Sequence, residues 1–163
     1  MPLQPNPLLV KHSDMLKLIY TMAELDSEQL LAIYKEHNWD ELDFLSYLRE
    51  DFFRQRDAVY AVWVEASEYK AAVRLERCQN GALLHSLETA PNERRKGYAY
   101  NLLMHFLDHL RTTDCKCVYS HVEKHNKASL ALHKKCGFEI ISDSATYLDG
   151  TVTQRSNTLR ISL

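Results

Sequence analysis

Three strand-like segments lie close together in the middle of the chain, and they constrain the fold more than any other feature. They cover Val59 to Ala66, Tyr69 to Cys78 and Ala82 to Thr89, and they contain β-branched and large apolar residues that are favoured in strands. Gaps of two and three residues separate them, and connections this short allow only antiparallel hairpins. Asn80 and Gly81 are typical of a hairpin turn whose central residues have positive φ. The sequence therefore predicts an antiparallel meander.

Helix and strand patterns on both sides extend this meander to an α/β (α+β) fold. Before it we expect a strand at Leu16–Met22, a helix from Asp26 or Ser27 to His37, and a helix at Glu41–Arg54. After it we expect a helix with an apolar stripe from Ala99 to Leu110, a strand at Lys116–Val122, a helix at Lys127–Cys136, and closing strands at Phe138–Ser144 and Asn157–Leu163. Asp149 and Gly150 predict a second hairpin turn. This order favours a mixed, mostly antiparallel sheet with helices on both faces.

The length of 163 residues suits one domain. Pro2, Pro5 and Pro7 indicate an extended leader over residues 1–14, which leaves residues 15–163 as the domain. No apolar run approaches the roughly 18 to 20 residues that span a bilayer, and the start lacks a secretion signal. We therefore expect a cytoplasmic protein without a membrane partner. A net charge of −2 gives no reason to expect nucleic acid as a partner.

Four cysteines and nearby histidines raise the question of a metal site. Cys115, Cys117, His121 and His125 have the spacing C-x-C-x3-H-x3-H, and these are zinc-ligand types. A zinc finger leaves about a dozen residues between its cysteine and histidine pairs. Here the set overlaps a strong strand pattern, so buried thiols and no metal are the favoured interpretation.

The segment from Arg94 to Ala99 predicts an anion site. Three cations, Arg94, Arg95 and Lys96, precede Gly97 and the start of a helix. A helix N-terminus exposes unpaired N–H groups and positive potential, and a glycine lets a ligand approach the backbone closely. Neither the Walker pattern nor the dinucleotide-binding pattern is present. The alternative is a solvated basic turn.

The pattern Arg94-x-x-Gly97-x-Ala99 resembles the acetyl-CoA pyrophosphate loop of the GCN5-related N-acetyltransferase (GNAT) family, R/Q-x-x-G-x-G/A. A second segment, NKASLALHKKCGF from Asn126 to Phe138, resembles the family's helix that opens on asparagine and closes on Gly-Phe. The resemblance covers about residues 15 to 163 and implies a GNAT fold. It also implies transfer of an acetyl group from acetyl-CoA to a primary amine of a small molecule or peptide, by direct attack in a ternary complex.

The same resemblance implies which residues hold the acetyl-CoA. The strand backbone at Leu87 and Thr89 is expected to pair with the pantetheine arm, and Asn126 is expected to approach it. The phosphate-binding residues that it implies are Arg94, Arg95, Lys96, Gly97, Tyr98 and Ala99.

Two residues are candidates for proton transfer. His133 stands four residues before Gly137, where many members of the family have the tyrosine that protonates the leaving thiolate; the alternative is a helical histidine of no special role. Glu88 is the candidate base, although water can serve instead. His85 lies on the same strand, and simple alternation predicts that it faces the opposite side from Glu88. Tyr119 and His121 on the next strand are further possibilities.

The two N-terminal helices are expected to form the acceptor side. Nine acids and two bases lie between Glu24 and Asp51, which favours a cationic amine if this face is more than a solvated surface. Trp39, Tyr47 and Tyr147 are candidates for lining the acceptor pocket. Homodimers are common in the family. A competing interpretation is a CoA-binding sensor or interaction module that has lost turnover.

Overall fold

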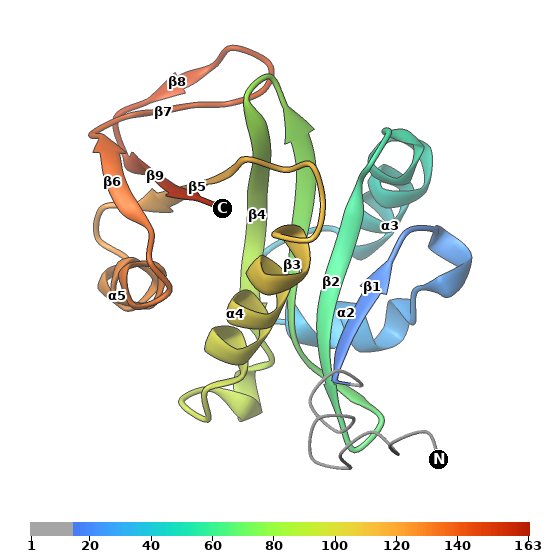
Figure 1. Ribbon diagram of the computed structural model, residues 1–163. Coiled ribbons are helices and arrows are strands. Elements are labelled where there is room, and N and C mark those ends of the chain that lie inside the picture. Colours follow the sequence, from blue (N-terminus) through green and yellow to red (C-terminus); the bar gives the residue numbers. More distant parts are fainter. Residues whose placement is uncertain (1–14) are drawn as a thin grey trace, which may run out of the picture.

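A computed structural model describes residues 15–163, and the predicted leader at 1–14 lies outside the described part. These residues form a seven-stranded sheet in the order β1-β2-β3-β4-β5-β9-β6 (Figure 1). Its strands are β1 (Leu16–Ile19), β2 (Val59–Glu65), β3 (Glu68–Cys78), β4 (Gly81–Thr89), β5 (Cys117–Glu123), β6 (Glu139–Ser142) and β9 (Ser156–Ser162). A separate small hairpin joins β7 (Ala145–Thr146) to β8 (Val152–Thr153).

Four α-helices occur in residues 15–163, together with three short 3-10 turns. The α-helices are α2 (Ser27–Ile33), α3 (Glu41–Glu50), α4 (Tyr98–Leu110) and α5 (Lys127–Lys135). The 3-10 turns are η1 (Met22–Glu24), η2 (Phe52–Arg54) and η3 (Pro91–Glu93). No helix in the described range is long and apolar enough to cross a membrane.

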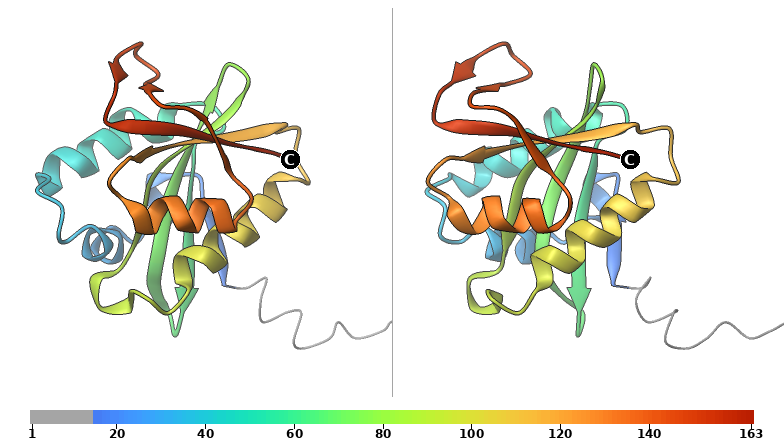
Figure 2. Two further views of the ribbon diagram at one scale, coloured as in Figure 1. Left: turned by 90° about the vertical axis from the view of Figure 1, so that its left-hand side faces the viewer. Right: turned by 60° about the vertical axis from the view of Figure 1, so that its left-hand side comes forward.

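The sheet separates two hydrophobic cores. On one face α4 buries Leu102, Leu103 and Phe106 against the strands, and α5 lies on the same side (Figure 2). On the other face α2 and α3 bury Leu30 and Leu48 against β2 and β3. Neighbouring strands are antiparallel except β4 and β5. The predicted mixed, mostly antiparallel sheet with helices on both faces is confirmed.

Several predicted elements are too long. The first strand ends at Ile19, and a 3-10 turn follows it where the prediction continued to Met22. The helix α2 ends at Ile33 because Tyr34 leaves the helix to bury its ring; its hydroxyl donates to the Ser86 carbonyl at 2.6 Å. The helix α3 ends at Glu50, and η2 replaces its predicted last turn.

The two turns of the meander differ from the prediction in their backbone. Cys78 pairs with Gly81 across the second turn, but neither Asn80 nor Gly81 has positive φ. Glycine is required at 81 for another reason, because a Cβ there would overlap the carbonyl oxygen of Cys117 and lie 2.8 Å from its sulfur. Positive φ occurs instead in the first turn, at Ala66 (52°) and Ser67 (63°).

We expect the double substitution Ala66→Asn with Ser67→Gly to stabilise the protein by about 1 kcal/mol. Left-handed backbone costs a non-glycine residue roughly 1 to 2 kcal/mol, and Asn-Gly is the pair that this turn type prefers. Chemical denaturation measures the change in unfolding free energy. The same Asn-Gly pair placed at Gln79 and Asn80 is the matched control, where no gain is expected; equal gains would refute the explanation.

Candidate functional site

The main feature of the site is a wedge between the parallel strands β4 and β5. Only three residue pairs join them, and the last is Leu84 with Ser120. From His85 to Thr89, β4 is paired only with β3 on its other side. Figure 2 shows β5 and β9 running across the direction of β4. Leu87 and Thr89, predicted to supply backbone to a cofactor, both lie on this open part of β4.

The loop that follows β4 brings several backbone N–H groups to the open end of the wedge. Arg95 and Gly97 both have left-handed backbone, with φ of 65° and 85°. Gly97 is the N-cap of α4, and no side chain caps the helix. A Cβ at Gly97 would meet nothing within 4 Å, so open space lies beside the backbone. Together with the positive end of α4, this geometry suits a phosphate group.

Two of the three loop cations are already paired. Lys96 Nζ lies 2.8 Å from Glu93 Oε2, and Arg94 Nη1 lies 2.8 Å from Glu36 Oε2. These carboxylates raise the pKa of both cations, which therefore stay charged. Arg95 is exposed and has no ion pair with a residue in the range 15–163. Its side chain is consequently the one most available to an anion, whereas Arg94 and Lys96 offer their backbone.

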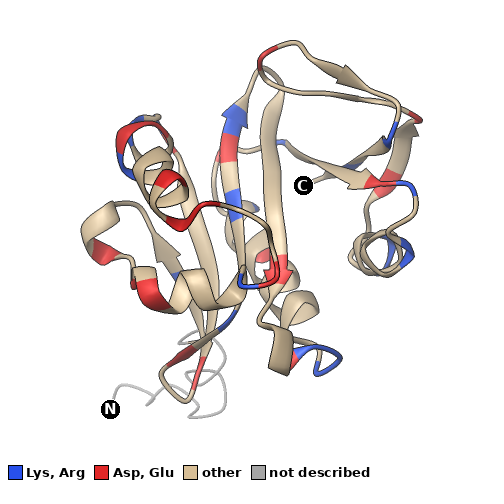
Figure 3. Ribbon diagram, turned by 180° about the vertical axis from the view of Figure 1, so that it is seen from behind, with Lys and Arg blue, Asp and Glu red and all other residues tan. Residues whose placement is uncertain are grey.

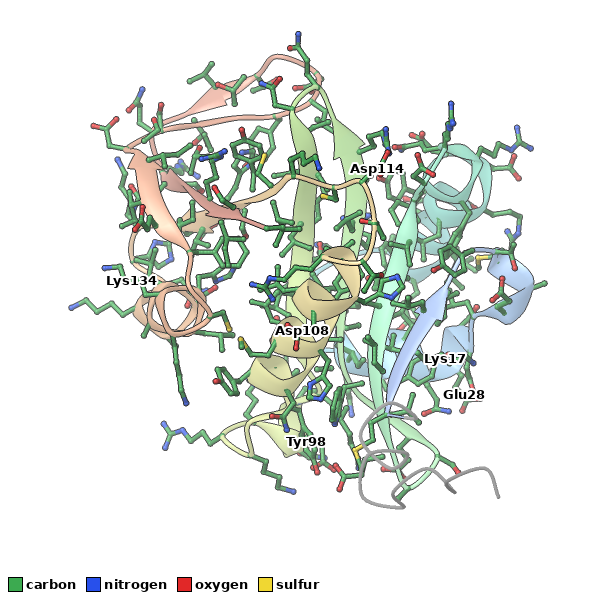
Figure 4. The ribbon with its side chains drawn as sticks, in the orientation of Figure 1. Lys17, Glu28, Tyr98, Asp108, Asp114 and Lys134 are labelled. Carbon is green, nitrogen blue, oxygen red and sulfur yellow. The ribbon has the colours of Figure 1, made fainter. Side chains whose placement is uncertain are left out.

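The remaining loop residues begin the helix. Tyr98 and Ala99 are the first two residues of α4, and Figure 4 labels Tyr98 at that end of the molecule. Asn126 caps α5, since its side-chain oxygen accepts a hydrogen bond from the Ser129 N–H at 3.1 Å. Asn126 is exposed, so its other polar atoms remain accessible.

His133 is the buried residue of α5 and is only 2% exposed. Its Nδ1 is 2.8 Å from the Ser129 carbonyl, which can only accept, so this nitrogen carries the proton. Its Nε2 therefore accepts from the Ser120 hydroxyl at 2.9 Å. Burial lowers the pKa of His133. The ring is neutral, and both of its nitrogens are hydrogen-bonded. Its partner Ser120 is also the last β5 residue that pairs with β4.

A β-bulge in β4 corrects the prediction that His85 and Glu88 face opposite sides. Ala72 of β3 pairs with Glu88, and Arg74 pairs with His85. Two steps along β3 therefore correspond to three steps along β4. Ser86 within the bulge has φ of 56°. Because Ala72 and Arg74 are two apart, their partners lie on the same face. His85 and Glu88 therefore both face the side covered by α2 and α3.

Glu88 has a partner that the sequence did not suggest. His37 Nε2 lies 2.8 Å from Glu88 Oε2, and the imidazole packs against the Trp39 ring at 4.6 Å between centroids. Arg94 approaches the other oxygen of Glu88 at 3.6 Å. His37 follows the end of α2 in a connection without a periodic pattern, so nothing in the sequence signalled its position.

A second carboxylate and imidazole lie at the narrow end of the wedge. Glu76 is 5% exposed; its Oε1 accepts from the Tyr47 hydroxyl at 3.1 Å, and its Oε2 is 3.5 Å from His85 Nε2. The pKa of Glu76 is lowered, chiefly by His85. His121 stands on the β5 side, with a buried Nδ1 that has no partner among the described residues. In the sequence, polar residues at alternate positions of β3, such as Arg74 and Glu76, could have indicated that Glu76 shares a face with Arg74.

The aromatic residues predicted for the acceptor side occupy two places. Trp39 is 41% exposed and packs on Tyr34 and Phe44, beside His37. Tyr147, 40% exposed, meets the His121 ring edge-on at 5.4 Å. Figure 3 shows acidic positions over α2 and α3, and basic positions in the loop before α4.

The zinc alternative finds no support in residues 15–163, where no three potential ligands are gathered. Cys117 is buried with its thiol donating to the Asn80 carbonyl, and His125 is an exposed partner of Glu123. A separate cavity of about 380 Å³ lies near the other end of α4, beside Asp114. The Arg77 guanidinium in this cavity is paired with the carboxylates of Asp57 and Asp114.

Comparison with known proteins supports the family and the fold. A sequence model of the acetyltransferase (GNAT) family matches residues 19–138. The ribosomal-protein-S18-alanine N-acetyltransferase of Escherichia coli has a similar structure, with a TM-score of 0.64 at 19% identity over 91% of this chain and 93% of that one. PaiA N-acetyltransferase of Thermoplasma acidophilum, solved in complex with coenzyme A, gives 0.65 at 15% identity over 91% and 99%.

A third similar structure is a chimera of the spermidine N-acetyltransferase SpeG from Vibrio cholerae and hSSAT. Its TM-score is 0.69 at 20% identity, over 91% of this chain and 95% of that one. No curated protein sequence matches the chain. At these identities the structural matches speak for the fold alone.

Proposed function

The chain belongs to the acetyltransferase (GNAT) family, and we propose that it is an acyl-CoA-dependent N-acetyltransferase. It transfers the acetyl group of acetyl-CoA to a primary amine of a small molecule or a peptide. The observation that carries this proposal is the wedge between β4 and β5, which opens beside the uncapped N-terminus of α4. An elongated ligand with phosphates at one end and a reactive thioester at the other fits such a place.

The acetyl-CoA phosphates bind to the loop from Arg94 to Ala99, where N–H groups and the helix dipole meet negative charge. Arg95 adds a free cation, and the ion pairs of Arg94 and Lys96 hold the loop in shape. The pantetheine arm pairs with the open β4 edge at Leu87 and Thr89, and Asn126 approaches it from α5.

The amine attacks the thioester carbonyl directly in a ternary complex, which forms a C–N bond and breaks the C–S bond. An ammonium group must first lose one proton to become a nucleophile. Glu88 lies on the acceptor face next to His37 and is 24% exposed, so it can receive that proton directly or through the imidazole. We assign Glu88 this first deprotonation.

The acceptor is proposed to be cationic before it reacts. Acidic side chains cluster over α2 and α3, and Glu36, Glu76 and Glu88 all belong to the acceptor side. Such a face attracts cations over a distance limited by ionic strength. The amine's identity, a homodimer and a cytoplasmic location stay predictions.

The experiment that tests this function is a calorimetric titration with acetyl-CoA, followed by a panel of amines with detection of released thiol. We expect one-to-one binding and turnover that is higher for cationic amines at low salt than at high salt. Binding without turnover of any amine would favour the CoA-binding sensor or interaction module instead, an alternative suggested by the buried, fully bonded His133. A folded protein that does not bind acetyl-CoA would overturn the proposal.

His133 is proposed to be a positioning residue that holds Ser120 beside the leaving thiolate. We expect His133→Ala to lower turnover more than acetyl-CoA affinity, and to destabilise the protein by about 2 to 4 kcal/mol because a buried ring and its hydrogen bonds are lost. His133→Gln is the milder companion variant. If the role passes through Ser120, Ser120→Ala and the double variant should have the same turnover. Unchanged turnover in His133→Gln and Ser120→Ala would remove the role.

Burial of His133 also predicts how stability depends on pH. The folded protein holds this ring with a lowered pKa, whereas an unfolded histidine titrates near pH 6.5. The unfolded state therefore binds more protons on the acid side, and stability is lost as the pH falls below about 6.5. Denaturation between pH 7.5 and 5 should show this loss, and the slope should be shallower in His133→Gln. Equal slopes in both proteins would contradict the assignment.

A further inference from the structure

The narrow end of the wedge is a distinct chemical environment from the loop end. The ladder between β4 and β5 closes at Leu84 and Ser120, so His85 is the first residue of β4 without a β5 partner. A ligand anchored by its phosphates near Gly97 and lying along β4 reaches this closed end with the part farthest from the phosphates. For acetyl-CoA that part is the thioester, so His85 stands where the reacting carbon would arrive.

Glu88 lies at the other end of this path. It is three residues nearer to the loop, and Arg94 of the loop approaches its Oε1 at 3.6 Å while His37 occupies Oε2. Because the bulge at Ser86 lets these three steps of β4 oppose only two steps of β3, at about 3.3 Å per step, Glu88 is roughly 7 Å from His85 along the sheet. With Glu88 assigned to the entering ammonium, a separate group at the closed end of the wedge can serve the reacting centre.

The His85 ring contacts the buried carboxylate of Glu76 through its Nε2 edge. Its Nε2 is fully buried and lies 3.5 Å from Glu76 Oε2, longer than a normal hydrogen bond but within ion-pair distance. Such contacts are often long before substrate binds and shorten in the reactive complex. Tyr47 holds the other oxygen of Glu76 at 3.1 Å. The ring keeps 22% of its surface exposed, and Nδ1 has no hydrogen bond to a described residue.

On the basis of the proposed acetyl transfer, we propose that His85 is a catalytic residue that moves a proton from the attacking nitrogen to the departing sulfur. Glu76, held by Tyr47, is the positioning residue that keeps Nε2 protonated and leaves the Nδ1 lone pair free. One imidazole then serves as base and acid in turn.

The proton balance requires such a group. After the amine attacks, its nitrogen is positively charged and still carries one proton too many. Nδ1 of His85 takes that proton as the C–N bond is completed, and Glu76 stabilises the imidazolium. The C–S bond breaks, the electron pair stays on sulfur, and the proton passes from Nδ1 to the thiolate. The products are the amide and the CoA thiol, and His85 is neutral again.

The surroundings of His85 fit this sequence of steps. Arg74, its backbone partner on β3, holds its guanidinium over the Tyr47 ring and donates to the Ser86 hydroxyl. His121 stands on the neighbouring strand β5, and both burial and the neighbouring His85 lower its pKa. A cavity of about 280 Å³ lies beside His121 and is also lined by Leu83 and Tyr119. Direct protonation of sulfur by the buried His133 is then unnecessary.

The test compares His85→Gln, His85→Ala and Glu76→Gln with the parent protein, using a saturating amine from the panel. We expect His85→Gln to lower kcat about 100-fold, as for loss of a general acid–base group, with acetyl-CoA affinity by calorimetry unchanged. Added imidazole should restore turnover to His85→Ala, which a merely structural role would not explain. Glu76→Gln should lower kcat less, and Glu76→Asp should recover part of the loss.

The control is His109→Gln, which removes a histidine at the far end of α4 and should leave kcat unchanged. Thermal unfolding shows that each variant is folded. An active parent with an active His85→Gln variant would overturn the His85 assignment alone. A loss of kcat without imidazole rescue and without any effect of Glu76→Gln would also overturn it. A parent protein that acetylates no amine would overturn the proposed function and this assignment together.

Discussion

Gly97→Glu is expected to weaken acetyl-CoA binding by at least about 100-fold, which corresponds to about 2.7 kcal/mol. The carboxylate would enter the open space beside Gly97, where a phosphate is proposed to lie. It would repel the phosphate, and its bulk would keep the anion from the N–H groups at the start of α4. Hydrogen bonds to a charged group contribute roughly 1.5 to 3 kcal/mol each, so the loss of two accounts for the effect. Calorimetric titration measures it.

The matched control for this substitution is Gly150→Glu. Gly150 also has positive φ, at 90°, and a Cβ there also meets nothing within 4 Å, but it lies in the turn between β7 and β8. Both variants carry the same added charge and similar backbone strain of roughly 1 to 2 kcal/mol. We expect similar losses of stability and a loss of binding only at Gly97. Full acetyl-CoA affinity in a folded Gly97→Glu protein would show that the loop does not bind the phosphates.

Gly81→Ala is expected to destabilise the protein by about 3 kcal/mol, near the upper end for overpacking of a core. The new methyl group would overlap the Cys117 carbonyl oxygen, and a backbone atom cannot move aside as a flexible side chain can. Relief requires β4 and β5 to separate at the end where their only ladder begins. The unfolding free energy from chemical denaturation measures the effect.

Gly150→Ala is the control for Gly81→Ala, because its Cβ is unobstructed and only the positive φ is unfavourable. The two glycines separate a steric requirement from a conformational one. Removing the sulfur with Cys117→Ala should not rescue Gly81→Ala, since the closest clash is with the carbonyl oxygen. A rescue would show that the side chain at 117, and not its backbone, excludes a larger residue at 81.

Local patterns in the sequence were sufficient for the main architecture. The short gaps of the meander, the apolar stripe of α4 and the asparagine that opens α5 depend on contacts within a few residues, and each is where it was expected. The loop before α4 likewise has the predicted strand before it and helix after it. Its role in binding acetyl-CoA stays a prediction.

Features that depend on one irregular residue or on distant contacts were not predictable. The bulge at Ser86 reverses the face of everything after it, and a rule of strict alternation therefore misplaced Glu88 relative to His85. His37 meets Glu88 across 51 positions of sequence. His133 was expected at a reacting surface, yet Ser120 and Ser129 bind both its nitrogens inside the protein. Only the three-dimensional packing could reveal these contacts.

The short ladder between β4 and β5 also determines how the protein resists local opening. Strands β1 to β4 and strands β5, β9 and β6 form two leaves, and just three residue pairs join them. Backbone amides in so short a hinge exchange with solvent through openings that need less free energy than global unfolding. A ligand arm bound along β4 would brace both leaves at once. Its binding energy would then suppress these openings, and slower amide exchange around Leu84 and Ser120 would report occupancy from a distance.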